Sequence, residues 1–128
     1  MFYRTISKRK KGFIMGTWGF EIFDDDIAFD VKATFEDYVD GGMSMDEVTE
    51  RIMEDFEDAL NDPDEYPVVI LAIAILQLKE DDIVDTIRES ALDIIESGDL
   101  LAAWEYADPE DLQEKKKLLK QLKSKLLK

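Results

Sequence analysis

At the centre of the chain stand nine apolar residues without a break, Val68-Val69-Ile70-Leu71-Ala72-Ile73-Ala74-Ile75-Leu76. About 20 such residues are needed to cross a bilayer, so this run is too short for a membrane span. A buried strand is an alternative, but the sequence continues through Lys79 without a turn signal, which favours a helix. Pro67 suits the first turn of a helix. We therefore expect a central helix over about 67–79 that other helices cover on every side.

Two helices are predicted before this run. The first spans about 25–40, where apolar residues recur at helical spacing and Gly41-Gly42 provides the stop. The second begins at a capping box, Ser44-Met45-Asp46-Glu47, and continues to a turn at 61–64. Their expected inward-facing residues are Ile27, Val31, Phe35 and Tyr38 in the first, and Val48, Ile52, Phe56, Ala59 and Leu60 in the second.

Further helices are predicted after the apolar run. Asp81 or Asp82 is expected to cap a fourth helix that Gly98 closes, and a short fifth helix is expected over about 99–107. A last helix follows Pro109, with leucines at heptad spacing and lysines in its later turns. The predicted fold is therefore all-α, a compact bundle of five to six helices in one acidic domain over 15–128 that ends in a Lys-rich amphipathic helix.

The amino-acid composition excludes several classes of function. The 128 residues include no Cys and no His, which excludes thiol nucleophiles, zinc–thiolate sites and Ser-His or Cys-His mechanisms. The formal net charge is −15 at pH 7, so the chain repels nucleic acid and attracts basic proteins or cations. We expect no catalytic residue, no cofactor, no nucleic-acid or membrane partner, and a cytoplasmic location.

Residues 1–14 differ from the rest because they carry Arg4 and the basic run Lys8-Arg9-Lys10-Lys11 without any acid. They lack the apolar centre of a signal peptide. A second Met stands at position 15, and we hypothesise that translation often begins there. The alternative is a genuine basic arm that pairs with the acidic domain.

Two groups of carboxylates are candidate sites. Asp24, Asp26 and Asp30 offer oxygen ligands for Mg²⁺ or Ca²⁺, although helix capping explains acids at these positions without any metal. The second helix carries a candidate docking face for a cationic partner, but runs of charge are usually ordinary solvated faces, which is the preferred interpretation of these residues taken alone. Like charges four residues apart destabilise a helix slightly, which favours a functional purpose for this face. Its residues are Glu47, Glu50, Glu54, Asp55 and Asp58.

The opening from Met15 to Asp30, Met-Gly-Thr-Trp-Gly-Phe-Glu-Ile-Phe-Asp-Asp-Asp-Ile-Ala-Phe-Asp, resembles the start of a family of small bacterial proteins classed as a domain of unknown function. The resemblance supports Met15 as the start of the domain and implies no activity, because none is established for the family. The Lys-rich last helix is not part of this signature. The matching residues are Gly16, Trp18, Gly19, Phe23, Asp24, Asp26, Ala28 and Asp30.

Three functions are compatible with these observations. The first is a non-enzymatic interaction domain that binds a basic protein through its acidic face, as an immunity-type or inhibitory partner does. The second is a metal-binding or hydrolytic domain built on Asp24, Asp26 and Asp30. The third is a structural module that forms homo-oligomers through its last helix.

Overall fold

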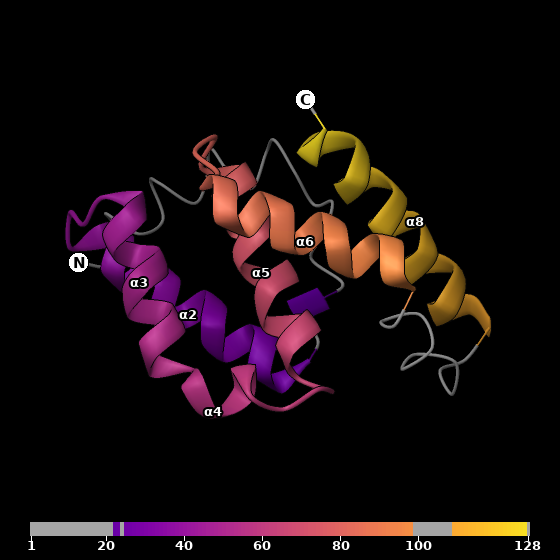
Figure 1. Ribbon diagram of the computed structural model, residues 1–128, viewed down its shortest axis with the longest axis horizontal. Coiled ribbons are helices and arrows are strands. Elements are labelled where there is room, and N and C mark those ends of the chain that lie inside the picture. The colour runs from indigo at the N-terminus through magenta and orange to yellow at the C-terminus, as the bar shows by residue number, and fades with distance from the viewer. Residues whose placement is uncertain (1–21, 24, 99–108, 128) are drawn as a thin grey trace.

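The computed structural model describes residues 22–23, 25–98 and 109–127, and this part of the chain is all-α without any strand (Figure 1). The predicted fold class is confirmed. The basic extension 1–14 and the predicted short helix over 99–107 lie outside the described residues. The helices are α2 (Asp26–Asp40), α3 (Met45–Asp55), α4 (Glu57–Leu60), α5 (Tyr66–Lys79), α6 (Asp85–Ser97) and α8 (Pro109–Leu126).

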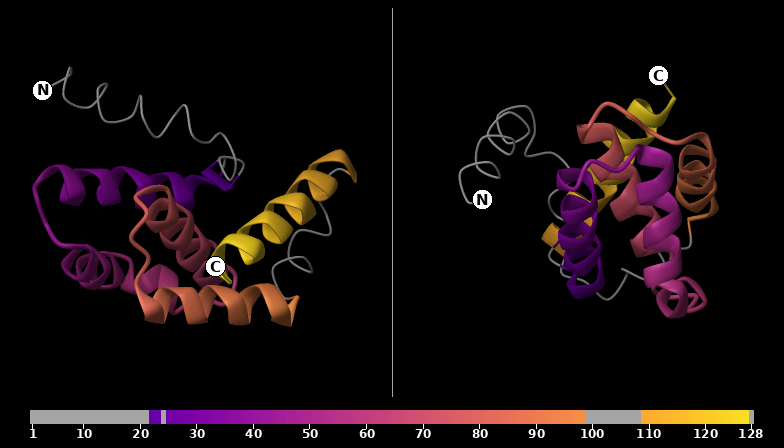
Figure 2. Two further views of the ribbon diagram at one scale, coloured as in Figure 1. Left: turned by 90° about the horizontal axis from the view of Figure 1, so that it is seen from above. Right: turned by 90° about the vertical axis from the view of Figure 1, so that its left-hand side faces the viewer.

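Helix α5 lies at the centre of the molecule, and α2, α4, α6 and α8 all contact it (Figure 2). Every residue from Pro67 to Gln77 is buried, so α5 has no solvent-facing side along most of its length. A helix that is apolar all round is stable in water only when neighbouring helices cover it. The central apolar helix predicted over about 67–79 is confirmed.

Local signals fix the ends of α2 and the start of α3. The Asp25 carboxylate caps α2 by accepting hydrogen bonds from the backbone N–H groups of Ile27, at 2.9 Å, and Ala28, at 3.4 Å. The chain then reverses at Gly42, whose φ of +90° suits glycine because it has no Cβ. Ser44 caps α3, with its Oγ accepting from Glu47 N at 3.3 Å. The predicted stop and the predicted cap at Ser44 are both confirmed.

The second predicted helix is not continuous. Helix α3 ends at Asp55 and α4 begins at Glu57, with Phe56 between them at φ −110° and ψ 28°. The prediction of one helix through Leu60 was therefore wrong. Phe56 is partly buried and packs against the core, and Ile52 before it and Ala59 after it are buried. Helical hydrogen bonds continue on both sides of the break, from Phe56 N to Ile52 O and from Leu60 N to Phe56 O, both at 2.9 Å, so the interruption is confined to one residue.

The start of α6 also differs from the prediction. Val84 is the N-cap residue, so neither Asp81 nor Asp82 caps this helix. The backbone N–H of this N-cap residue donates a hydrogen bond to Oε1 of the buried Gln77, at 3.0 Å. Asp81 instead adopts a left-handed conformation, with φ +59°, in the turn between α5 and α6. The predicted end of α6 at Gly98, with φ +76°, is confirmed.

Helix α8 packs on its own domain through its leucines. It contacts α6 and α5, and the four leucines that line this contact are almost fully buried. One ion pair supports the packing from the side, between Lys123 Nζ and Glu96 Oε2 at 3.8 Å. The buried leucines are Leu118, Leu119, Leu122 and Leu126.

Candidate interaction face

The candidate docking residues of the second predicted helix all lie on the surface of α3 and α4. Val48 and Ile52 are fully buried on the inner side of α3, and this burial directs the intervening acids into solvent. Residues 47, 50 and 54 recur at spacings of three and four, which places them in one row on α3. We call the following set the acidic face: Glu47, Glu50, Glu54, Asp55 and Asp58, all exposed.

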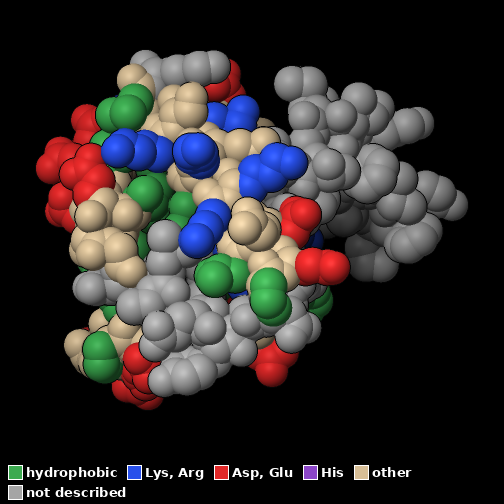
Figure 3. All heavy atoms as spheres, turned by 90° about the vertical axis from the view of Figure 1, so that its right-hand side faces the viewer, with side chains coloured by type: hydrophobic (Ala, Val, Ile, Leu, Met, Phe, Trp, Pro, Cys, Tyr) green, Lys and Arg blue, Asp and Glu red, His purple; other side chains and the backbone are tan. Residues whose placement is uncertain are grey.

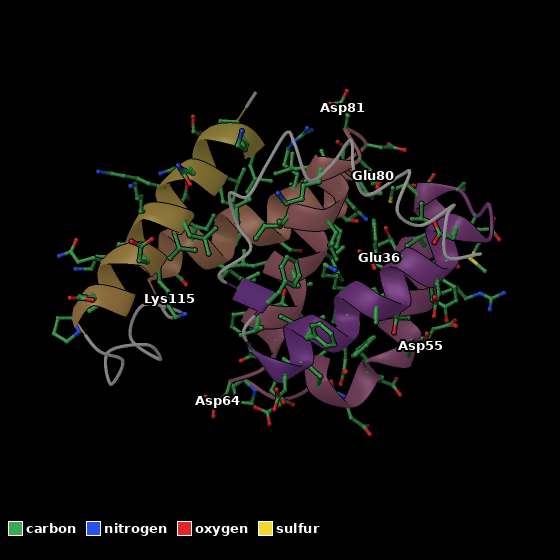
Figure 4. The ribbon with its side chains drawn as sticks, turned by 180° about the vertical axis from the view of Figure 1, so that it is seen from behind. Glu36, Asp55, Asp64, Glu80, Asp81 and Lys115 are labelled. Carbon is green, nitrogen blue, oxygen red and sulfur yellow. The ribbon has the colours of Figure 1, made fainter. Side chains whose placement is uncertain are left out.

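Asp55 at the edge of the acidic face contacts α2. The Tyr38 hydroxyl donates a hydrogen bond to Asp55 Oδ2, and Figure 4 shows Asp55 on α3 beside α2. This hydrogen bond raises the pKa of Tyr38, as do partial burial of the phenol and the negative charge of Asp55, whereas Arg51 acts in the opposite direction. Asp55 therefore joins α3 to α2, while the other four carboxylates of the acidic face point outward.

The acidic face has few local counter-charges. Arg51 is the only cation in the sequence between residues 45 and 60. Among the described residues, the ion pairs join Lys32 to Glu36, Arg88 to Asp85 and Lys123 to Glu96, and none of them involves the acidic face. Uncompensated charges of one sign on one surface raise the local concentration of oppositely charged molecules.

The carboxylates predicted as metal ligands are only partly described. Asp26 and Asp30 are exposed on the outer side of α2, one turn apart, and Asp24 lies outside the described residues. The described neighbour Asp25 caps the helix. No cluster of three or more acidic side chains arranged to hold a metal ion occurs among the described residues. The metal site on Asp24, Asp26 and Asp30 stays a prediction.

A buried polar junction between α3, α5 and the start of α6 was missed by the sequence analysis. Gln77 is fully buried, and its Nε2 donates to Thr49 Oγ1 at 2.7 Å while its Oε1 accepts from Val84 N. Thr49 in turn donates to the backbone carbonyl of Met45 at 2.8 Å. The only sequence signal was a lone amide at the end of the apolar run. The junction holds α3, and with it the acidic face, in one position on α5.

A protein-family model described as a domain of unknown function (DUF4259) matches residues 16–127. The chain belongs to this family. The match to DUF4259 spans all six described helices, including the Lys-rich α8, which the sequence analysis had left outside the resemblance. Searches of the curated proteins and of the solved structures found no match. Among the described residues, no helix has the length and apolar character needed to span a membrane.

Proposed function

We propose that this DUF4259 domain is a non-enzymatic, cytoplasmic interaction domain that binds a basic protein through the acidic face, in the manner of an immunity-type or inhibitory partner. One observation carries this proposal. Carboxylates that are exposed and lack ion-pair partners among the described residues line two consecutive helices, and the buried inner sides of those helices fix their direction. Such a face presents negative charge without having to reorganise on binding.

The charge of the whole chain supports the same role. At a net charge of −15, the domain attracts a cationic partner from a distance and accelerates their encounter. Electrostatic steering of this kind depends strongly on ionic strength, because salt screens charges beyond about 8 Å at physiological concentration. An inhibitor that competes with an anionic substrate for a cationic groove needs these properties.

The structure bears on the alternative role of α8 as an oligomerisation helix. The leucine side of α8, which the alternative would use, is buried against α5 and α6 of the same chain. An oligomer built on these leucines would have to expose them first, and each buried leucine that became exposed would cost about 2 kcal/mol. The acidic face needs no such rearrangement, which is why we prefer it.

The proposal is tested with a fluorescently labelled, lysine- and arginine-rich helical peptide as the probe. The wild-type chain and the variant E50K/E54K are titrated into the peptide, and binding is followed by fluorescence anisotropy. Reversing two exposed charges removes two attractions and adds two repulsions, about 2 kcal/mol in all, so we expect the Kd to rise about 30-fold. The affinity of the wild type should also fall steeply as salt is added.

The variant E89K/D93K serves as the matched control. It reverses two exposed acids that are four residues apart on α6, so its net charge changes by the same amount. We expect its Kd to stay within about 3-fold of wild type, because only the long-range attraction changes. Equal losses of affinity in the two variants would show that net charge alone attracts the peptide, and the proposed face would then be wrong. A host protein that is captured at low salt by the wild type and by E89K/D93K, but not by E50K/E54K, would be identified as the natural partner.

A further inference from the structure

The outer side of α8 carries a compact basic surface. Lys116, Lys117 and Lys120 are exposed there, and we call these three residues the lysine face. The sequence contains no acid from residue 115 to the end of the chain. Figure 3 shows lysine and arginine side chains gathered on the side of the molecule that α8 forms.

Packing fixes the direction of the lysine face. Leu118, Leu119 and Leu122 are interspersed among these lysines along α8 and are buried on the opposite side. Because a helix turns once every 3.6 residues, burial of the leucines forces the lysines outward. The lysine face is therefore as firmly positioned as the acidic face.

The acidic face and the lysine face lie at opposite ends of the molecule. Helices α3 and α8 are at the two ends in Figure 1 and remain apart in the view from above in Figure 2. Figure 4 likewise places Asp55 of α3 and Lys115 of α8 on opposite sides. Within one copy the two faces therefore do not reach each other, and the described part of the chain leaves the side chains of both faces exposed.

We propose that the lysine face of one copy binds the acidic face of a second copy, so that the chain self-associates head to tail. The two faces are complementary in charge and in spacing. Lys116 and Lys120 are four residues apart on α8, as Glu50 and Glu54 are on α3, so each pair spans about 6 Å along its helix axis. A contact between two different faces leaves one free face of each kind at the ends, and the assembly grows into a ring or an open chain.

Net charge limits the strength of this contact. Two copies, each with a net charge of −15, repel one another at a distance. Salt screens this repulsion beyond about 8 Å at physiological ionic strength, whereas the lysines and carboxylates of the two faces meet at much shorter range. We therefore expect a weak association at moderate salt that high salt abolishes. This self-association uses the same acidic face as the proposed function but requires no other protein. A basic partner would therefore compete with the lysine face for the acidic face.

Sedimentation velocity of the purified full chain tests this inference. At about 0.15 M salt, where the Debye length is about 8 Å, we expect the average mass to rise above 14.8 kDa as protein concentration increases, and to return to that value at about 1 M salt. The variants K116E/K120E and E50K/E54K should each stay monomeric. An equal mixture of these two variants should associate again, because each then supplies the face that the other has lost.

The variant E89K/D93K is the control and should associate as the wild type does. Circular dichroism establishes that each variant is folded, and K116Q/K120Q replaces any reversal variant of α8 that is not. A wild-type mass that stays at 14.8 kDa at every concentration and salt would overturn the inference. Association that persists in both reversal variants, or a mixture that remains monomeric, would do so as well. None of these measurements involves the cationic peptide, so failure here leaves the test of the proposed function intact.

Discussion

Replacement of Gln77 by Glu tests the buried junction between α3, α5 and α6 at constant side-chain volume. The ionised carboxylate retains an acceptor for Val84 N but has no donor for Thr49, whereas the protonated carboxyl regains an O–H donor. The larger cost comes from charge. Position 77 is fully buried, and burial favours the protonated form of a carboxyl group, so its folded-state pKa rises above the unfolded value of about 4.3.

The sign and the size of the pH dependence follow from this shift. A group whose pKa is raised on folding binds its proton more tightly in the folded state, so its stability contribution is lost as pH rises above the unfolded pKa. A rise of about two units would cost about 2.7 kcal/mol at pH 8 and about 1.6 kcal/mol at pH 5.5. Because the protonated form can still donate to Thr49, the raised pKa already contains the lost donor, so Gln77→Glu should destabilise the chain by about 3 kcal/mol at pH 8 and about 1 kcal/mol less at pH 5.5.

The assay is urea denaturation followed by circular dichroism at both pH values, with the pH dependence of the wild type subtracted. Gln77→Met is the control, because it removes both hydrogen bonds without introducing a charge and should therefore cost about 1–2 kcal/mol at either pH. A destabilisation by Gln77→Glu that is the same at both pH values, or that at pH 8 is smaller than that of Gln77→Met, would refute the argument that position 77 is buried and needs a donor.

Four other measurements address separate features. Ser44→Ala should lower the free energy of unfolding by about 1 kcal/mol in urea titrations, because it removes the cap of α3. Leu122→Ala should lower it by about 3 kcal/mol, whereas an α8 that only touched the surface would show a loss below about 1 kcal/mol. Asp81→Gly should raise the thermal midpoint by a few degrees by relieving the left-handed backbone at φ +59°. Of the four tyrosines, Tyr38 should ionise above the ordinary tyrosine pKa of about 10 in an absorbance titration, and Asp55→Asn should lower the pH of that transition. Because the pKa of Tyr38 is raised on folding, the stability linked to it is present below about pH 10 and is lost as pH rises through the folded-state pKa.

The helices could be predicted where the signals are local. Ser44 caps α3 through its own side chain, and Gly98 closes α6 in a conformation that suits glycine, so the residue type indicates the boundary directly. The apolar run of α5 was equally informative, since nine consecutive apolar residues must be covered on every side. These features depend on residues close together in the chain.

Two boundaries were predicted wrongly, at the start of α6 and within the second predicted helix. The acids at Asp81 and Asp82 have the chemistry of N-caps, but the N-cap of α6 is Val84, whose backbone N–H donates a hydrogen bond to Gln77. Phe56 interrupts the second helix without any glycine or proline to signal the break. At α6 the buried Gln77 side chain thus overrides the local capping preference, whereas the break at Phe56 has no local sequence signal.

The acidic face could be predicted as a row of exposed acids from helical spacing alone. Its contact with Tyr38 could not, because Asp55 lies 17 residues away from that tyrosine and only the packing of α2 on α3 brings them together. From the sequence, the lysine face was recognised only as lysines in the later turns of the last helix. Its position opposite the acidic face depends on the three-dimensional arrangement of α3 and α8, which no local pattern contains.

The Gln77 side chain limits which sequence changes along α5 keep the same fold. A helix covered by similar branched apolar side chains can rotate about its axis or shift its register by one residue at little cost in free energy. Several arrangements of such a helix then have similar free energies. Only one rotation of α5 lets Gln77 meet both Thr49 and Val84, so a single polar side chain selects one arrangement among many. Sequences that exchange Val, Ile and Leu elsewhere along α5 should therefore keep the same fold as long as they keep this amide and its two partners.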